Sequence, residues 1–122
     1  MLSSAYVKDP LDPAFENDSG LKDWRAWMSK YLPGEDVRRS SFVFGYNSAA
    51  ALVQVLKQAG NDLSRENIMH QATNLRDVEL PMLLPGIKVN TSPTDYYPVQ
   101  QLQLVRFDGR RWVRFGDLVY DE

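Results

Sequence analysis

The segment SSFVFGYNSAAALVQVLKQAG, residues 40–60, contains the clearest helix signal in the chain and decides how the rest is interpreted. Four apolar residues recur at i, i+3, i+4 and i+7, the spacing of one helix face: Ala49, Leu52, Val53 and Leu56. Lys57 lies in the last turn, and Gly60 can adopt the left-handed conformation that ends a helix. Ser40 or Ser41 is expected to cap the start by accepting a bond from a backbone N–H. We therefore predict a helix whose apolar stripe packs into the core.

Three aromatic side chains surround Gly45 near the start of this helix. We call Phe42, Phe44 and Tyr46 the aromatic entrance. Such a cluster fits either a ligand contact or the packed shoulder of a helix. Aromatic side chains at a helix start belong to the core more often than to a ligand site, because they bury large apolar areas. The residues alone favour the structural role.

Two further helices are predicted on either side of this one. Residues 19–34, SGLKDWRAWMSKYLPG, end in Pro33-Gly34 and place one apolar stripe at spacings of three, four and three: Leu21, Trp24, Met28 and Tyr31. In residues 61–75, Ser64 is the expected cap and Glu66 occupies the positive first turn. A narrower stripe follows it: Ile68, Ala72 and Leu75. The opening residues contain two Asp-Pro steps and predict an extended connector.

The C-terminal part predicts short strands and turns ending in a β-hairpin. QLQLVRF and RRWVRF, residues 101–107 and 110–115, flank Asp108-Gly109, which is typical of a two-residue type I′ turn. Pairing outward from that turn places Phe107 opposite Arg110 and Val105 opposite Trp112. Both faces of the hairpin then carry apolar side chains, so we expect helices or further sheet to cover it.

Composition limits the chain to one modest domain and excludes several classes of protein. Its 122 residues contain 14 basic and 16 acidic side chains, and this net charge of -2 gives no field that attracts nucleic acid. There is no Cys, so neither a disulfide framework nor a thiolate metal site is expected. No apolar run approaches the ~20 residues of a membrane helix, and the first ten residues lack the pattern of a secretory signal.

Catalytic and cofactor motifs are missing from the sequence. His70 is the only His and lies on the polar flank of a predicted helix. The isolated glycines form no phosphate-binding loop, and no metal-ligand spacing is present. We therefore expect a protein that is not an enzyme and has no metal or cofactor.

One basic cluster stands out on the predicted hairpin. It consists of Arg106, Arg110, Arg111 and Arg114, interleaved with Phe107 and Trp112. Basic and aromatic side chains together can form a stacking surface for nucleic acid. Charged residues also protect exposed sheet edges from aggregation, and this interpretation agrees better with the charge of the whole chain.

Several motifs in order resemble the C-terminal part of one protein family. They are the Gly-Tyr helix, LKQAG, the LSREN cap, LLPGI, SPTDY and the FDGRRW strand, spread over residues 42–119. Together they resemble periplasmic substrate-binding proteins of the branched-chain amino-acid ABC transporter type, the type I periplasmic binding proteins. The resemblance implies two α/β lobes that close on a ligand, in a protein roughly three times this length.

The resemblance also implies a division of the chain and a site. Residues 1–19 would form a connector between lobes, 20–105 would complete the first lobe, and 106–122 would return to the second. The chain would be a partial lobe of an α/β protein in the periplasm, with its signal peptide outside this chain. Its partners would be a small-molecule solute, the remaining lobes and an ABC permease. The loop entering the Gly-Tyr helix faces the cleft in the family, which implies ligand contacts from Ser41, Phe42, Phe44 and Tyr46.

A different kind of function fits the same residues. A third of a two-lobed fold exposes sheet edges and apolar helix faces, and both promote self-association. The chain would then be an interaction module that forms homo-oligomers and transports no ligand.

Overall fold

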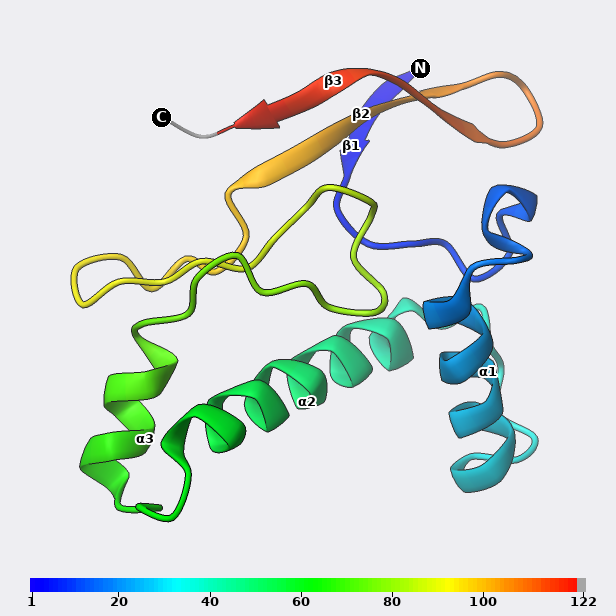
Figure 1. The fold of residues 1–122 in the computed structure, drawn as a ribbon. Coiled ribbons are helices and arrows are strands. Elements are labelled where there is room, and N and C mark those ends of the chain that lie inside the picture. Colours follow the sequence, from blue (N-terminus) through cyan, green and yellow to red (C-terminus); the bar gives the residue numbers. More distant parts are fainter. Residues whose placement is uncertain (121–122) are drawn as a thin grey trace.

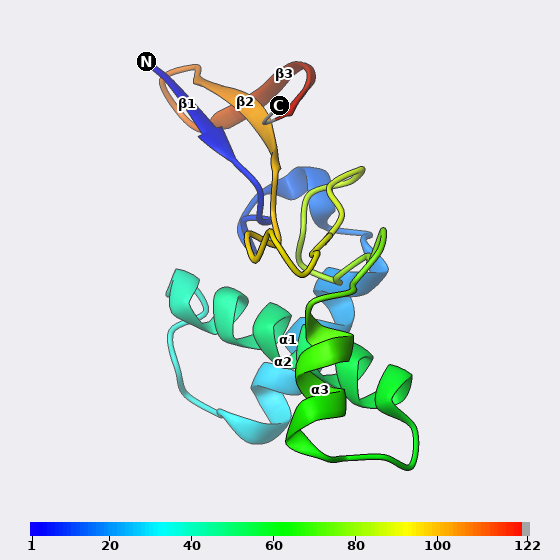
Figure 2. The same ribbon diagram turned by 90° about the vertical axis from the view of Figure 1, so that its left-hand side faces the viewer.

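The structure, a computed structural model that describes residues 1–120, has a sheet at one end, helices at the other and an irregular segment, residues 73–100, between them (Figure 1). In chain order the elements are β1 (Leu2–Ala5), the 3-10 helix η1 (Pro13–Phe15), α1 (Ser19–Tyr31), α2 (Ser40–Ala59), α3 (Arg65–Ala72), β2 (Gln101–Phe107) and β3 (Trp112–Tyr120). Figure 2 shows the same layers from the side. The predicted α/β class, with three helices and a C-terminal antiparallel hairpin, is confirmed.

Helix α2 begins and ends close to the predicted residues, but its start is not capped as expected. The N-cap is Arg39, which makes no side-chain capping bond. Ser40 and Ser41 already lie inside the first turn, so the prediction that one of them caps the helix is wrong. At the other end Gly60 has a φ of +62° and donates its N–H to the Leu56 carbonyl, as expected for a glycine stop.

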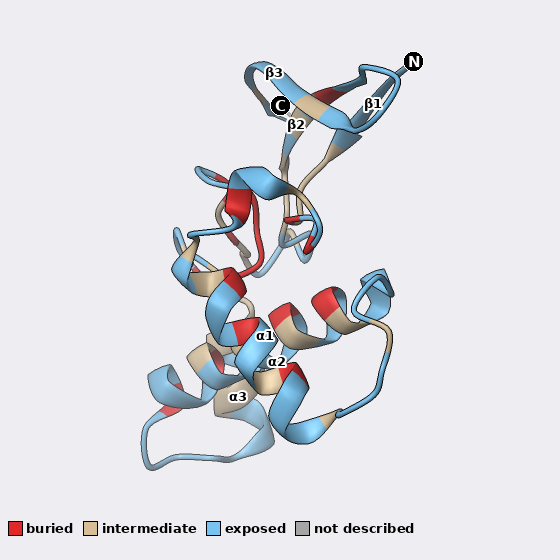
Figure 3. Cartoon of the chain, turned by 90° about the vertical axis from the view of Figure 1, so that its right-hand side faces the viewer, coloured by how far each residue is buried: buried red, intermediate tan, exposed pale blue. Residues whose placement is uncertain are grey.

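The buried side of α2 differs from the predicted one. The buried residues are Val43, Asn47, Val55 and Ala59, whereas Leu52, Val53 and Leu56 are 53%, 49% and 38% exposed. Figure 3 shows the buried positions gathered on one side of the helix. Apolar residues surround α2 on nearly every side, so their spacing could not select the buried face. The Asn47 side chain selects it, because its Oδ1 accepts the Met82 N–H at 3.0 Å.

The two shorter helices both have side-chain caps, and in α3 the cap is the predicted Ser64. Asp18 accepts the Leu21 N–H at 2.8 Å at the start of α1, and Ser64 accepts the Asn67 N–H at 3.3 Å at the start of α3. Three members of the predicted α1 stripe are buried: Leu21, Trp24 and Met28. The fourth, Tyr31, is exposed at the end of the helix.

The sheet has the order β1-β2-β3, with every pair antiparallel. The opening connector supplies β1, and this strand covers the free edge of β2. Phe107 pairs with Trp112 and Val105 with Arg114, so the predicted two-residue turn is wrong. Asp108 accepts the N–H groups of Arg110 and Arg111 at 2.9 Å each and closes a longer loop. The register moves by two residues, which keeps Val105, Phe107 and Trp112 on one face.

The N-terminal segment, α1 and the irregular segment meet at one buried ammonium group. Lys8 Nζ donates to Asp18 Oδ2 at 2.8 Å and to the Pro81 carbonyl at 2.7 Å. Its backbone N–H also donates to the Met82 carbonyl at 2.8 Å. Burial pushes the pKa of Asp18 upward, but the bonds from Lys8 and from the Leu21 N–H outweigh it and leave that pKa below its usual 3.8. Lys8 therefore ties together segments that are far apart in the sequence.

We expect Lys8→Met to lower the free energy of unfolding by about 2–3 kcal/mol, because it leaves the Asp18 carboxylate unpaired and only partly solvated. Asn caps helices as well as Asp does, so the double variant Lys8→Met/Asp18→Asn should be more stable than Lys8→Met alone. Urea denaturation followed by circular dichroism measures both. Lys22→Met, which removes an exposed ammonium from α1, is the control; an equal loss in Lys22→Met and Lys8→Met would contradict the central role of Lys8.

Substitution by Ala should change the free energy of unfolding in opposite directions at two glycines. A Cβ on Gly20 would overlap the Pro81 carbonyl oxygen, whereas a Cβ on Gly45, inside α2, would meet no atom within 4 Å. Gly20→Ala should therefore lower the free energy of unfolding by about 2 kcal/mol. Gly45→Ala should raise it by about 1 kcal/mol, since Ala is the better helix former. Denaturation midpoints of the two variants check the sign, and a stabilised Gly20→Ala protein would show that α1 is not held against Pro81.

Candidate functional site

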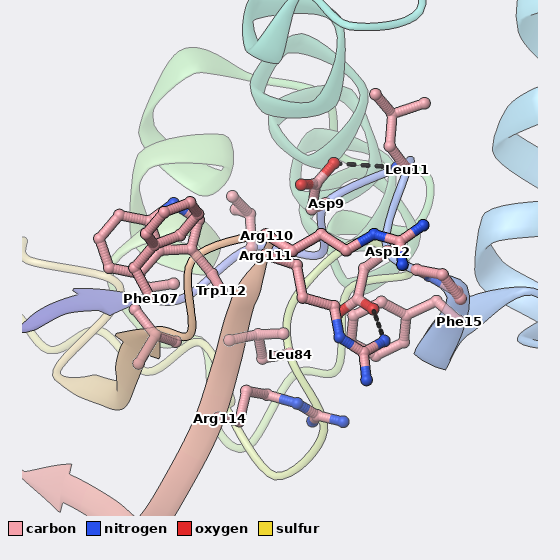
Figure 4. Close-up of a pocket in the computed structure, with 14 residues that line it drawn as sticks. Asp9, Leu11, Asp12, Phe15, Leu84, Phe107, Arg110, Arg111, Trp112 and Arg114 are labelled. Atoms are coloured by element: carbon pink, nitrogen blue, oxygen red, sulfur yellow. Dashed lines mark hydrogen bonds and ion pairs between the residues drawn. The ribbon is translucent and has the colours of Figure 1, made fainter. Parts of the chain in front are cut away.

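The hairpin end and the segment Asp9–Phe15 enclose a hollow of about 440 Å³. We call it the arginine pocket. Its charged lining consists of Arg110, Arg111, Arg114, Asp9 and Asp12, and the rest is largely apolar. Figure 4 shows the three arginine side chains extending from the hairpin toward Asp12 and Phe15. Residues about a hundred positions apart in the sequence thus form one concave surface.

Local backbone geometry positions the arginines. The Asp108 carboxylate accepts the N–H groups of Arg110 and Arg111, while the Asp108 N–H donates to the Arg111 carbonyl at 3.1 Å. The bonds from the two arginine N–H groups lower the pKa of the Asp108 carboxyl, and the bond from Arg111 contributes more than the bond from Arg110. Gly109 has a φ of +101° inside this loop, a conformation that favours glycine. The loop is therefore fixed by its own hydrogen bonds, and the two side chains start from defined positions.

Two of the guanidinium groups make specific contacts across the pocket. Arg111 Nη1 lies 4.0 Å from Asp12 Oδ1, and the Arg114 guanidinium carbon lies 4.9 Å from the centre of the Phe15 ring. Among residues 1–120, no carboxylate lies within 4.0 Å of the side-chain nitrogens of Arg110 or Arg114. Both groups therefore keep N–H donors directed at the pocket or at solvent.

The apolar wall of the pocket comes from aromatic and aliphatic side chains. The Phe107 and Trp112 rings lie 5.4 Å apart at 54°, an arrangement close to edge-to-face packing. Leu84 and Val105, both buried, also line the pocket. An apolar body next to fixed cationic donors is the arrangement that binds a small organic anion.

The residues of the predicted ligand site lie elsewhere, on the first two turns of α2. Phe44 is 40% exposed and its ring lies 5.9 Å from that of Tyr6, while the Tyr46 ring lies 5.3 Å from that of Trp27. Phe42 is half-buried against the core and Ser41 is exposed. Phe44 and Ser41 thus face solvent, whereas Phe42 and Tyr46 are mainly packing residues.

A second hollow of about 430 Å³ runs along α2 past Trp27, Tyr46 and Val53. Of the four predicted site residues, Tyr46 lines this hollow. Ser41, Phe42 and Phe44 line neither it nor the arginine pocket. The structure therefore brings the four predicted residues together on one helix end, without enclosing a cavity between them.

The arginine cluster is visible in the sequence, but the pocket is not. Its pocket-forming partners, Asp9, Asp12 and Phe15, lie in a segment described only as a connector. Arg106, the fourth member of the cluster, pairs with Leu2 and Val113 on the opposite face of the sheet. In the observed register Arg114 pairs with Val105, the neighbour of Arg106 in β2, and period-two alternation then places Arg114 and Arg106 on opposite faces.

The described residues form neither a cluster of metal ligands nor a membrane-spanning helix. Across residues 1–120, no three His, Asp or Glu side chains come close enough together to hold a metal ion. Within the same range no helix combines the length and apolar character needed to cross a membrane.

The fold, but not the sequence, matches a known protein. No protein-family model and no curated protein sequence matches the chain. The structure is similar to a solved structure described as a branched-chain amino acid ABC transporter from Thermus thermophilus with bound valine, with a TM-score of 0.73 and 14% identity. The similarity covers 98% of this chain and 33% of that one, so this chain spans about a third of the protein it matches. At this identity the likeness establishes the fold alone.

The hydrogen bonds of the loop that positions the arginines should be measurable in the titration of the Asp108 carboxyl. NMR titration of the Asp108 carboxyl should give a pKa below the usual 3.8, and the stability that the loop bonds provide should fall as the pH drops through that pKa. Arg111→Gln should leave most of the shift in place, because the backbone N–H that causes it remains. A pKa that returns to 3.8 in Arg111→Gln would show instead that the guanidinium charge sets it.

Proposed function

We propose that the chain is the C-terminal third of a solute-binding protein that captures a small organic solute in the periplasm and delivers it to an ABC permease. The observation that carries this proposal is the fold likeness over 98% of the chain to one third of a transporter structure solved with bound valine. Within the proposed division, residues 1–19 connect two lobes, 20–105 complete the first and 106–122 return to the second. The protein binds its solute without catalysis.

Uncovered apolar surface supports the view that further lobes complete this chain. Leu52, Val53 and Leu56 form an exposed face along α2. On the sheet, Leu102 pairs with Val119 on the side away from the irregular segment, and these two are 39% and 46% exposed. Contiguous apolar surface of this kind usually marks an interface. The remaining lobes of the longer protein are the proposed partners for both surfaces.

The aromatic entrance and Ser41 are the proposed contribution of this chain to the ligand cleft. Phe44, already exposed, would contact the solute with its ring, and Phe42 would support it from the half-buried position. Aromatic walls suit an apolar amino acid or an aromatic acid, through area burial and edge-to-face contacts. Ser41 would add one hydroxyl for a polar group of the solute.

The test uses the longer protein encoded by the genomic sequence that contains this chain. Thermal-shift screening against branched-chain amino acids and aromatic acids should find a solute that raises the melting temperature. Phe44→Ala in that protein should weaken binding by about tenfold, the loss expected for one aromatic contact. Tyr31→Ala, an exposed aromatic on α1, is the matched control. A longer protein that binds a macromolecule and no small solute would contradict the proposal.

The second candidate function is a stand-alone module that self-associates, and the exposed face of α2 is the observation that favours it. Analytical ultracentrifugation of the 122-residue chain should then show dimers or larger species at micromolar concentration. The triple variant Leu52→Gln/Val53→Gln/Leu56→Gln should be monomeric, while Leu63→Gln, which removes an exposed leucine outside α2, should still associate. A compact monomer in the unsubstituted chain would count against this function.

A further inference from the structure

The arginine pocket has a charge pattern that selects the kind of ligand it can hold. Three guanidinium groups and two carboxylates line it, which leaves one net positive charge. Asp12 accepts the Ala14 N–H at 2.9 Å and faces Arg111, and Asp9 accepts the Leu11 N–H at 2.9 Å. Both carboxylates thus have donors within the chain. The unmatched charge belongs to Arg110 and Arg114, which have no carboxylate within 4.0 Å among residues 1–120.

The size and the walls of the pocket indicate how large the ligand is and that its uncharged part is apolar. A hollow of about 440 Å³ lies in the range of small-molecule sites. Phe107 and Trp112 offer ring faces and edges, each being about 40% exposed. A ligand held here needs an apolar body to cover these rings and one anionic group to meet the guanidinium donors.

We infer that the arginine pocket binds a small monocarboxylate with an aromatic or apolar body, and that the unpaired guanidinium groups of Arg110 and Arg114 supply the positive charge that attracts the carboxylate. This site lies on the hairpin and the connector, so it goes beyond the proposed function and does not require the missing lobes. The planar guanidinium group offers two parallel N–H bonds to one carboxylate. Stacking of Arg114 on Phe15 leaves its N–H groups free, because they point outward in the plane of the group.

The pocket is organised before any ligand arrives. Arg114 is fixed on β3 by the pairing of its backbone with Val105 and by its contact with Phe15. Arg110 starts from a loop that the Asp108 carboxylate holds closed. A preorganised pair of donors loses little conformational entropy on binding, and this favours affinity for a small ligand.

The same observations disfavour nucleic acid as the occupant. Asp9 and Asp12 line the pocket and would repel a phosphate backbone. Arg106 lies on the other face of the sheet, so the basic residues form no continuous stripe. A nucleic-acid surface needs several cations along a backbone track, and a concave site with one net charge does not provide it.

The test uses the 122-residue chain and three probes that share a phenyl body: phenylacetate, phenylacetamide and 2-phenylethylamine. NMR titration with phenylacetate should shift the Trp112 indole N–H and the Arg110 and Arg114 Nε–H signals. Phenylacetamide, which lacks the charge, should bind at least about tenfold more weakly, as expected when a charged hydrogen-bond partner is lost. The amine should not bind.

Substitutions then separate the pocket from general charge effects. Arg114→Gln and Arg110→Gln should each weaken phenylacetate binding by about tenfold. Arg38→Gln is the charge-matched control, since Arg38 pairs with Asp36 in the loop before α2. Arg110 contributes only its backbone N–H to the loop, so Arg110→Gln keeps the fold even where Arg114→Gln loses stability.

Four outcomes would overturn the inference. They are equal binding of phenylacetate and phenylacetamide, shifts confined to Phe42, Phe44 and Tyr46, equal losses in Arg110→Gln and Arg38→Gln, or a stronger response of the Trp112 signal to a single-stranded oligonucleotide. A failure of the pocket would leave the proposed cleft function standing, because that function is measured in the longer protein with Phe44→Ala.

Discussion

The Lys8 ammonium group is the interaction on which the rest of this structure depends. Asp18 receives a bond from it while also capping α1, and the Pro81 carbonyl receives another. A charged Lys8 side chain that is 8% exposed is tolerated because both bonds replace the lost hydration of its ammonium group. The irregular segment has backbone hydrogen bonds of its own, such as the pair between Val78 and Val89. This cation on one side and Asn47 of α2 on the other join it to the two longer helices. These two polar contacts help to fix the spacing between the sheet and the helices, together with the apolar core that includes Trp24, Val43 and Leu84.

The same contact shapes both candidate sites. Lys8 directly precedes the Asp9–Phe15 segment, and its bonds hold that segment beside the hairpin, where it closes the arginine pocket. On the other side, the Leu84 N–H donates to the Tyr6 carbonyl at 2.9 Å, and the Tyr6 ring contacts Phe44 at the aromatic entrance. A pocket at the hairpin and an exposed ring on α2 are therefore supported from one framework. The arginine side chains of the pocket and the Phe44 ring are not part of the hydrogen bonds that form this framework.

Two helix ends that depend on local chemistry were predictable from the sequence. Ser64 and Gly60 mark helix ends because a hydroxyl acceptor and a left-handed glycine act within one turn. The hairpin loop was predicted wrongly because Asp108 bonds two N–H groups beyond Gly109, a choice that Asp-Gly alone does not dictate. The arginine pocket needed the approach of Asp12 to Arg111, a long-range contact set by tertiary packing. Local patterns carry no information about which distant segments meet.

Helix α2 has two apolar faces, the predicted stripe, which is exposed, and a different face, which is buried. Periodicity placed Leu52, Val53 and Leu56 in a core, yet the described chain buries Val43 and Val55 on a different side. A helix that is apolar all round belongs in an interior, because each uncovered large side chain forgoes about 1.5–3 kcal/mol of burial. One face packs into the core that contains Trp24, Met82 and Leu84, and the other face is exposed. The exposed face of α2 therefore has the composition of a second interface, and residues 1–120 leave it uncovered.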